Sequence, residues 1–554
     1  MRKVILSIFL FLFIGICVFY SYSSNLYGPF VYDDIWQIVD SQDIDSSRYL
    51  TSNNWRIITN LSFWLNYNLG STLEERNAIT TIGSHSTFCW HSTNIILHFL
   101  CGIVVLLFCR HLGFSWQISL VFSGFFVVHP LASEAVNYIQ ARSVILLTIF
   151  LILSIIYHKN TKLFVLFSLC TIFSKEVGCF YVLAMTILFH RRAISRRVYF
   201  LVFWFILLTL LLFPMILERL TSLNLFDNSA QQIFAFWYYV KLFVYPLAQT
   251  FSFDHAATNF SVFKLLSGFV TIILTGFFLY KCTEKNAFNL FLASLIILIP
   301  YLLIPTKFAI VEYRAYPLLA FFIMILGALS QMFCSWVTLK IHTFYKKPGV
   351  VQQKFHVHKK KFMYILAYAA LTSIIVLSLL FLSQETRKRS MKWQSAVSIY
   401  ADAVNKGSAR KSIHINLCVS YVATGQLFWR NEQQKIAMSY FLLGEHTINN
   451  YMRQVKEISR EHMFNLYLQL LKIYEVRKDF TKIISVITRL KKEIPVMSKK
   501  HSILMLLEAE TYFYQQKYAQ SQVILTKLDS FKFTKNLQQR YNNLVRKIQQ
   551  IQKK

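Results

Sequence analysis

Charged residues, and acidic ones above all, are scarce in this chain. Only 15% of its 554 residues are charged, with 26 Asp+Glu against 58 Lys+Arg, whereas ordinary soluble domains carry about 25% charged residues. This shortage argues against a soluble enzyme. The nine cysteines contain no CxxC pair and mostly lie within apolar runs, so neither a disulfide framework nor a zinc site is supported.

Apolar residues make up 55% of the sequence, and the long apolar runs lie almost entirely within residues 1–383. A helix that crosses a bilayer needs about 20 mainly apolar residues. We therefore predict an all-α polytopic membrane domain with eleven spans, near residues 4–20, 91–109, 115–129, 143–157, 161–174, 177–190, 197–217, 261–280, 286–304, 315–338 and 362–383. The first span resembles a signal peptide, but no convincing cleavage site follows it, so we interpret it as an anchor.

The formal charge of +32 at first favours a nucleic-acid partner. The basic clusters of the first region, however, lie in short loops between apolar runs, where membrane proteins have their cytoplasmic loops. We therefore expect no nucleic acid. With the N-terminus inside, the outer segments are residues 21–90, 130–142, 175–176, 218–260 and 305–314, together with everything after 383.

The predicted outer loops hold an unusual number of charges. The first loop carries Asp33 and Asp34 just after the first span. The later loops add His129, Glu134, Arg142, Lys175, Glu176, Glu312 and Arg314. An acidic pair alone fits a solvated turn or a helix N-cap, but charges at a membrane boundary are costly and tend to be paired or functional. Their accumulation on one face predicts a single site that opens outward.

Such a site suits the transfer of a sugar from a lipid phosphate. A carboxylate takes the proton of the acceptor hydroxyl, and a cation holds the departing phosphate. Nucleotide sugars are cytoplasmic reagents, so an outward-facing transferase would use a lipid-linked donor whose polyprenyl tail lies in the membrane.

Seven short blocks, in order along the chain, carry a family resemblance. They are Phe30–Asp34, Arg56–Asn66, His91–Asn94 with His98, His129–Asn137 with Ala141–Ser143, Ser174–Gly178, Tyr239–Asp254 and Val311–Pro317. Together they resemble the integral-membrane C-type glycosyltransferases, and most specifically the transmembrane and tetratricopeptide-repeat O-mannosyltransferases and their bacterial relatives. Ala132 and Val144 depart from the family pattern, which leaves the identity of the donor sugar open.

The resemblance implies that Asp33 or Asp34 is the catalytic base. We favour Asp33, with Asp34 orienting the substrate or binding a divalent metal, the only cofactor we consider. The candidate substrate-binding residues are Arg56, His91, His129, Glu134, Arg142, Lys175, Glu176, Glu312 and Arg314. The structural alternatives are ion pairs of Arg142 with Glu134, Lys175 with Glu176 and Arg314 with Glu312, a helix end at His129, and packing of His91 and His98 against a neighbouring helix.

Residues 384–554 form a second, basic region with 30 Lys+Arg against 12 Asp+Glu. Apolar residues recur with helical spacing, and the pattern beginning at Tyr474 returns 38 residues later at Tyr512. We predict an α-solenoid of divergent tetratricopeptide-like repeats, whose concave surface would bind the acceptor protein. Its charge favours acidic partners or anionic lipid headgroups, or is a solvated surface only.

Three functions remain open at this point. The first is a glycosyltransferase that moves mannose or another hexose from a polyprenyl-phosphate carrier to Ser or Thr of exported proteins. The second keeps this donor with a glycolipid or surface-polysaccharide acceptor, and the third is a non-enzymatic scaffold. The Phe-rich, Gly-poor composition, with 51 Phe and 15 Gly, favours a bacterial inner membrane with periplasmic repeats over the endoplasmic reticulum of a eukaryote.

Overall fold

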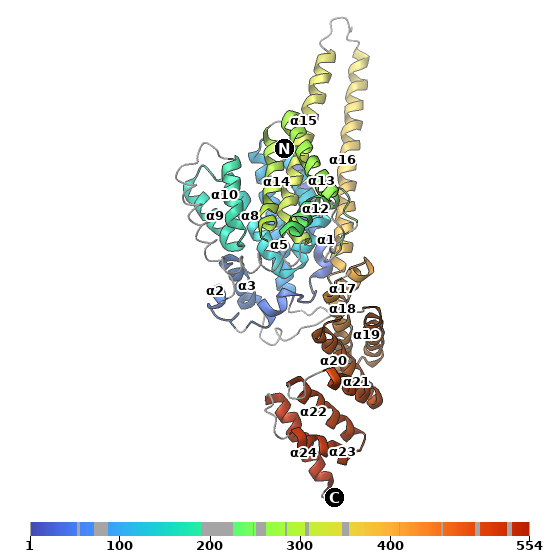
Figure 1. Ribbon diagram of the computed structural model, residues 1–554. Coiled ribbons are helices and arrows are strands. Elements are labelled where there is room, and N and C mark those ends of the chain that lie inside the picture. Colours follow the sequence, from blue (N-terminus) through green and yellow to red (C-terminus); the bar gives the residue numbers. More distant parts are fainter. Residues whose placement is uncertain are drawn as a thin grey trace. The chain divides into compact units, whose positions relative to one another are not determined.

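The chain is helical throughout the part that its structure, a computed structural model, describes. These residues are 2–41, 43–52, 56–70, 87–189, 225–247, 249–250, 262–282, 285–304, 310–345, 354–408, 410–455, 458–493, 499–528 and 535–552. No strand occurs within these ranges, which confirms the all-α prediction. The chain divides into two compact units, Met1–Ala409 and Arg410–Lys554 (Figure 1).

The first unit contains the apolar helices. They are α1 (Arg2–Tyr22), α3 (Ile57–Gly70), α5 (Phe88–His111), α6 (Trp116–Val128), α8 (Arg142–Ile156), α9 (Thr161–Ser174), α10 (Gly178–Phe189), α12 (Leu225–Val244), α13 (Val262–Cys282), α14 (Lys285–Leu303), α15 (Tyr316–Tyr345) and α16 (Lys354–Met391). Shorter elements are the helices α2 (Tyr49–Ser52), α7 (Ser133–Asn137) and α17 (Ala396–Asn405), and the turns η1 (Ser23–Asn25), η2 (Ile35–Val39), η4 (Pro130–Ala132), η5 (Ile139–Ala141) and η7 (Glu312–Ala315).

Ten of the eleven predicted spans coincide with helices, and the eleventh, 197–217, lies outside the described residues. Five helices are long and apolar enough to cross a membrane, and a bent pair makes a sixth. The remaining four, α9, α10 and the apolar parts of α13 and α14, are shorter. The structure therefore supports a protein that spans the membrane, while the number eleven stays a prediction. The sequence of the first outer loop also predicts amphipathic stretches around 54–69 and 73–83. Helix α3 overlaps the first, and the second lies outside the described residues.

The bent span is formed by α6 and the segment Pro130–Asn137, which meet at an angle of 53°. Pro130 explains the break, because proline has no N–H and disfavours a helical residue before it. His129 is accordingly extended, and its side chain accepts a hydrogen bond from the backbone N–H of Leu131 at the new helical turn. After the bend, Glu134 lies beside η7, where its carboxylate accepts a hydrogen bond from the Tyr313 N–H.

The predicted outer loops gather at one end of the first unit. The Ser21 and Ser383 hydroxyls lie 2.8 Å apart, so the end of α1 lies against α16, which continues beyond this contact to Met391. The Thr59 hydroxyl donates to the Ser174 carbonyl oxygen, which joins α3 to the end of α9. At the other end, the predicted inner residues His111 and His158 pack ring to ring, and α15 and α16 protrude far from α2 and α3 (Figure 1). This grouping agrees with the predicted alternation of loops.

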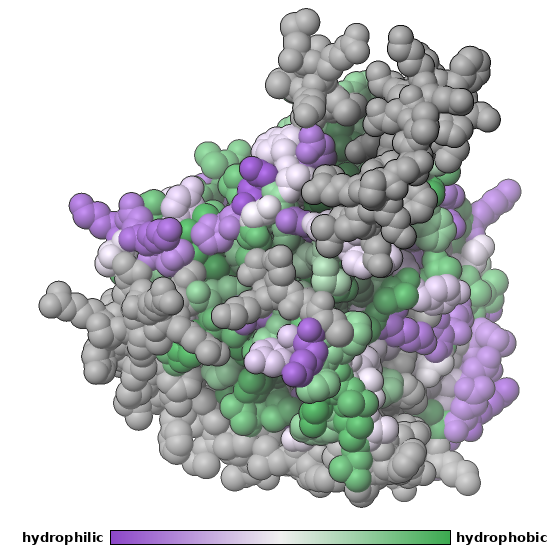
Figure 2. All heavy atoms as spheres, turned by 90° about the horizontal axis from the view of Figure 1, so that it is seen from above, coloured by the Kyte–Doolittle hydropathy of each residue, from purple (hydrophilic) through white to green (hydrophobic). Residues whose placement is uncertain are grey.

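The sides of the first unit expose apolar residues. On α13, Phe269, Ile273, Leu274 and Phe277 are each at least half exposed. Seen from the end at which α15 and α16 protrude, apolar side chains also reach the surface between hydrophilic ones (Figure 2). A helix face of this kind is suited to lipid and would be costly in water.

The second unit consists of helices that pack in consecutive pairs. They are α18 (Lys411–Arg430), α19 (Gln434–Gln454), α20 (Arg460–Arg477), α21 (Phe480–Glu493), α22 (Lys499–Tyr514), α23 (Tyr518–Leu528) and α24 (Lys535–Gln552). Phe441, Leu470 and Ile487 lie in its main core. Gly425 admits the Phe441 ring, because a Cβ at this position would lie 2.7 Å from it. The helical hairpins match the predicted pattern, whereas the tetratricopeptide assignment stays a prediction.

The boundary between the units lies beyond the predicted one at residue 383. Helix α16 continues past its apolar run as a polar helix, and the chain then turns back at Trp393. Trp393 stacks on Tyr138, with ring centroids 6.2 Å apart. Residues 384–408 therefore pack as part of the first unit.

Candidate functional site

The two acidic residues after α1 have different surroundings. Asp34 is 1% exposed, and its carboxylate accepts hydrogen bonds from the backbone N–H groups of Val31, at 3.1 Å, and Gln140, at 2.8 Å. Burial raises the pKa of Asp34 well above its usual value, although these two hydrogen bonds act in the opposite direction. Asp34 thus fastens the acidic loop to η5.

Asp33 is exposed and lies at the bundle end. Its backbone N–H donates to the Tyr138 hydroxyl at 3.2 Å, and its Oδ1 accepts from Trp36 Nε1 at 3.1 Å. Among the described residues no partner is recorded for Oδ2. Asp33 therefore has a carboxylate oxygen available for a substrate proton, whereas both oxygens of Asp34 are engaged.

Arg56 and Glu176 form a two-pronged ion pair between the first outer loop and the connection from α9 to α10. Arg56 Nε and Nη2 donate to the two Glu176 carboxylate oxygens at 2.7 and 2.8 Å. Burial alone would raise the pKa of Glu176, but the Arg56 guanidinium lowers it to about 2. Glu176 consequently pairs with Arg56, and the predicted pairing with Lys175 is not the one observed.

Lys175 is left as a cation without an anionic partner among the described residues. Its side chain is only 6% exposed, and its ammonium lies 4.9 Å from the centre of the Tyr313 ring. Burial lowers the pKa of Lys175 to about 7, with a further contribution from Arg56. The negative charge of Asp33 raises the pKa of Lys175, and the positive charge of Arg314 lowers it further. Asp33, Lys175 and Arg314 therefore share one electrostatic environment.

Arg314 reaches the site from η7, directly before α15. It is 8% exposed, and its guanidinium lies 4.5 Å from the centre of the Tyr301 ring. The preceding residue, Tyr313, packs against Tyr138 with ring centroids 6.1 Å apart. The short turn η7 thus supplies both the ring below Lys175 and a second cation.

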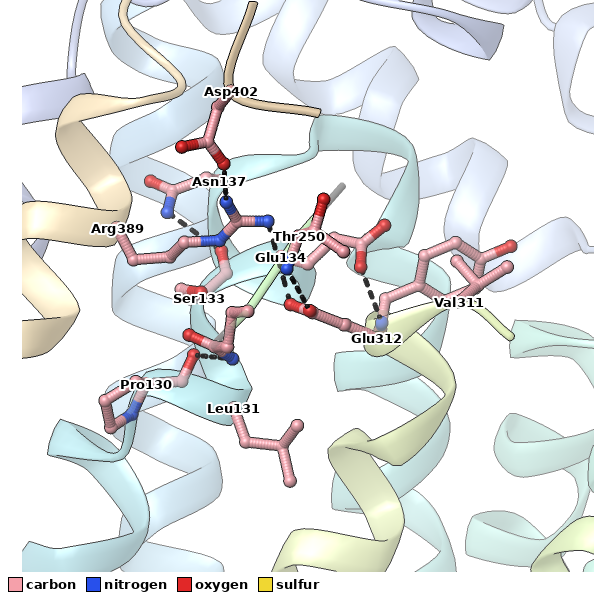
Figure 3. Close-up of polar contacts among 12 residues, drawn as sticks. Pro130, Leu131, Ser133, Glu134, Asn137, Thr250, Val311, Glu312, Arg389 and Asp402 are labelled. Carbon is pink, nitrogen blue, oxygen red and sulfur yellow. Dashed lines mark hydrogen bonds and ion pairs between the residues drawn. The ribbon is translucent and has the colours of Figure 1, made fainter. Parts of the chain in front are cut away.

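A second charged cluster includes Glu312 of η7 and is shown in Figure 3. Arg389 of α16 lies between two carboxylates, 2.9 Å from Asp402 of α17 and 3.7 Å from Glu312. Glu312 also accepts from the Thr250 N–H at 2.9 Å. Glu134 accepts from the Tyr313 N–H at 3.1 Å. The expected pair of Glu312 with Arg314 is thus replaced by Glu312 with Arg389, because α16 brings a cation that the loop pattern did not reveal.

Arg142 is fully buried and binds other parts of the protein. Its guanidinium donates to Asn94 Oδ1 at 2.6 Å, to the Ser62 carbonyl oxygen at 3.1 Å and to the Trp90 carbonyl oxygen at 3.0 Å. It also lies over the Phe63 ring at 4.7 Å. The expected ion pair with Glu134 is not formed, and Arg142 holds α3, α5 and α8 together.

The three histidines make contacts with backbone or neighbouring helices. His91 Nε2 lies 3.2 Å from the Gly28 carbonyl oxygen, and His129 Nε2 lies 3.0 Å from that of Phe243. His98 lies between the Tyr316 hydroxyl and the Val127 carbonyl oxygen. No group of three or more His, Cys, Asp or Glu side chains suited to a metal occurs among the described residues. Within that part of the chain Asp34 therefore belongs to no such group, and each of its oxygens accepts a backbone N–H.

Several residues of the site were not predicted. Tyr313 lies within a block that the sequence singled out and Tyr138 directly follows another, but an aromatic residue in a membrane protein carries no signal of its own. Arg389 stands in the basic run Arg387–Arg389 at the end of α16. The sequence signal for Arg389 was that this basic run lies on the predicted outer face, beside the other predicted outer charges.

Part of this chain is similar in sequence to curated protein O-mannosyl-transferases. Protein O-mannosyl-transferase F38B6.6 of Caenorhabditis elegans is 32% identical over 181 residues, which cover 28% of this chain and 24% of that protein. Homology links this chain to protein O-mannosyl-transferases. Protein O-mannosyl-transferase TMTC1 of Homo sapiens is 30% identical over 151 residues, 25% of this chain and 17% of that protein. Human protein O-mannosyl-transferase TMTC3 is 26% identical over 158 residues, 26% of this chain and 16% of that protein.

The predicted resemblance to the O-mannosyltransferases is thereby confirmed. The chain matches a quarter or less of the length of these relatives. No protein-family model and no solved structure matches it.

Proposed function

We propose that this protein is an integral-membrane glycosyltransferase that moves mannose or another hexose from a polyprenyl-phosphate carrier to Ser or Thr hydroxyls of exported proteins. One observation carries the proposal. An exposed carboxylate, Asp33, shares its surroundings with a buried ammonium, Lys175, that has no anionic partner among the described residues. The carboxylate suits an acceptor hydroxyl, and the ammonium suits a phosphate.

In the proposed reaction the acceptor hydroxyl attacks the anomeric carbon while Asp33 Oδ2 takes its proton. The bond from the anomeric carbon to the phosphate oxygen breaks, and the lipid phosphate leaves with the electron pair. Lys175 and Arg314 stabilise the negative charge of the leaving group. Attack from the face opposite to the phosphate would invert the configuration. Arg56, Glu176 and Asp34 position these groups.

The remaining candidates take supporting parts in this proposal. Arg142 and His91 hold the first outer loop on α5, and His129 fixes the bend of the broken span. Glu134 and Glu312 orient η7. The second unit, as a set of tetratricopeptide-like repeats, would bind the acceptor protein, with both on the outer face of a bacterial inner membrane.

The test is an assay of the purified full chain with polyprenyl-phosphate mannose and a Ser/Thr-rich acceptor protein. Asp33→Asn removes the base but keeps the shape of the side chain, so turnover is expected to fall on the order of 10²- to 10⁴-fold. Asp43→Asn, in the same outer loop, is the matched control and is expected to retain activity. Wild-type turnover in Asp33→Asn would overturn the assigned base.

The class of acceptor is a separate question, and cells carrying each variant answer it. If Asp33→Asn abolishes a protein-linked hexose, the protein acceptor is supported. If only a glycolipid or a surface polysaccharide is lost, the lipid-linked donor stands and the acceptor assignment falls. If neither Asp33→Asn nor Asp34→Asn changes any glycan, a scaffold is the better description.

A further inference from the structure

The acidic loop is held in a conformation that its sequence does not favour. Tyr32, the residue before Asp33, has a φ of 52°, which lies in the left-handed region that side chains other than glycine rarely adopt. Nothing in the covalent structure of tyrosine stabilises this conformation. A strained residue beside a functional group persists only when the surrounding structure holds it in place, so the contacts of Tyr32 identify what holds it.

The Tyr32 ring is enclosed by other aromatic rings. It meets Tyr400 of α17 edge to face with ring centroids 5.3 Å apart, and Tyr138 edge to face at 6.3 Å. Tyr138 in turn stacks on Trp393 at 6.2 Å, with an angle of 24° between the ring planes. The Tyr138 hydroxyl is also the acceptor of the Asp33 N–H. One set of rings therefore fixes both the strained residue and the backbone of Asp33.

The chain after α16 also closes over the start of this loop. A Cβ at Gly28 would lie 3.0 Å from the Trp393 carbonyl oxygen and 2.1 Å from Asn25 Oδ1. Gln394 Nε2 donates to the Ser24 carbonyl oxygen at 2.7 Å. A side chain at Gly28 would therefore have to displace the Asn25 side chain and would crowd the Trp393 carbonyl oxygen.

We infer that Trp393 and Tyr400 are positioning residues, which hold the left-handed turn at Tyr32 and thereby aim the Asp33 carboxylate at the acceptor. This inference rests on the proposed function. It assigns a part in the reaction to the segment 393–400. This segment follows the last apolar run of the chain and precedes the second unit, which begins at Arg410.

Anchoring of the segment agrees with this role. Asp402 on α17 is paired with Arg389, at 2.9 Å, and with Lys406, at 2.8 Å. Lys406 also donates to the Gln249 carbonyl oxygen. Helix α17 is therefore fastened to α16 and to the outer loop at residue 249. Its Tyr400 is thus held in a fixed position against the Tyr32 ring.

The experiment measures the loop and the reaction separately in the full chain. Hydrogen–deuterium exchange of the peptide 28–36 reports the turn, and steady-state kinetics with polyprenyl-phosphate mannose reports the reaction. Trp393→Leu and Tyr400→Leu are expected to speed exchange of this peptide and to lower kcat on the order of 10- to 100-fold, with KM for the donor changed less than about twofold. Tyr400→Phe keeps the ring, and its exchange of the peptide 28–36 and its kcat are expected to equal those of the wild type.

Matched controls are Trp336→Leu and Tyr280→Leu, which change exposed rings on α15 and α13 and are expected to leave exchange and kcat as in the wild type. Unchanged exchange in both Trp393→Leu and Tyr400→Leu would overturn the inference, because these side chains would then not hold the turn at Tyr32. This measurement does not depend on enzymatic activity. Faster exchange with an unchanged kcat would also overturn it, since the turn would then not aim the base. A kcat unchanged in Asp33→Asn would instead reject the proposed function.

Discussion

The Lys175 ammonium lies 4.9 Å from the centre of the Tyr313 ring, and this contact connects two loops that are 138 positions apart in sequence. A ring face attracts a cation without neutralising it. Lys175 is therefore held in position while its charge stays available to an anion. An ion pair with Glu176 would have consumed that charge, but Arg56 occupies Glu176 instead.

The first prediction concerns donor binding by Lys175. Lys175→Gln removes the ammonium, and because a hydrogen bond to a charged group contributes roughly 1.5–3 kcal/mol, KM for polyprenyl-phosphate mannose is expected to rise about 10- to 100-fold. Lys162→Gln, at the predicted inner end, is the matched control. A donor KM equal in Lys175→Gln and wild type would exclude Lys175 as the phosphate ligand.

The second prediction concerns pH. The pKa of Lys175 is about 7 without a ligand, and a bound phosphate would raise it. Below pH 7 Lys175 already carries its proton, so affinity for the donor is expected to be constant there. Above pH 7 binding must take up a proton, and the dissociation constant is expected to rise up to about tenfold per pH unit.

Calorimetric titration with polyprenyl-phosphate mannose in buffers of different ionisation enthalpy measures this proton uptake. Lys175→Arg keeps its charge at every accessible pH, so its affinity is expected to be independent of pH between 6 and 9. The same pH dependence in both proteins would show that another group is responsible.

The third prediction concerns stability in acid. The folded-state pKa of Glu176 is about 2, below the usual value of about 4.3. The pair with Arg56 therefore contributes stability that is present above about pH 4.3 and is lost as the pH falls through 2. The melting temperature of Glu176→Gln is expected to lie below that of the wild type at pH 7, and the difference is expected to shrink below pH 4. A difference that is constant from pH 7 to pH 3 would contradict the ion pair.

Much of the fold followed from the sequence, for a physical reason. Apolar runs must form helices in a bilayer, because backbone groups there have no water to bind, and basic loops alternate with them. Ten predicted ranges coincide with helices on this basis. The ranges 161–174 and 177–190 coincide with α9 and α10, but both helices are shorter than a bilayer crossing usually needs, so their assignment as spans stays a prediction.

The partners of each charge were harder to predict than their common location. Asp33 lies near enough to Lys175 to affect its pKa, and the part of these two residues in a common substrate site stays a prediction. Which cation pairs with which carboxylate depends on how the helices pack against one another, and this packing cannot be derived from the sequence pattern. The predicted pair of Glu312 with Arg314 was wrong for this reason: Arg389 approaches Glu312 from a helix far along the chain.

The fourth prediction concerns Arg142. Its three donor nitrogens bind Asn94, Ser62 and Trp90, and a lysine cannot bridge acceptors on two helices in that geometry. Arg142→Lys leaves buried acceptors without a donor and is expected to lower the stability of the folded protein by roughly 1–3 kcal/mol, seen as a lower melting temperature in detergent. Arg110→Lys, at the other end of α5, is the control. If Arg142→Lys melts as the wild type does but raises the donor KM, Arg142 is a phosphate ligand after all.

The fifth prediction concerns the cluster of Arg389, Glu312 and Asp402. Arg389→Met leaves the buried Glu312 without its cation, while Asp402 keeps Lys406, and losing one member of a buried ion pair costs roughly 3–5 kcal/mol. The triple variant Arg389→Met, Glu312→Gln and Asp402→Asn removes all three charges together. It is expected to melt at a higher temperature than Arg389→Met alone, because no buried charge remains without a partner. If the single and triple variants melt at the same temperature, water reaches these carboxylates and the cluster contributes little to holding η7 and α17 on α16.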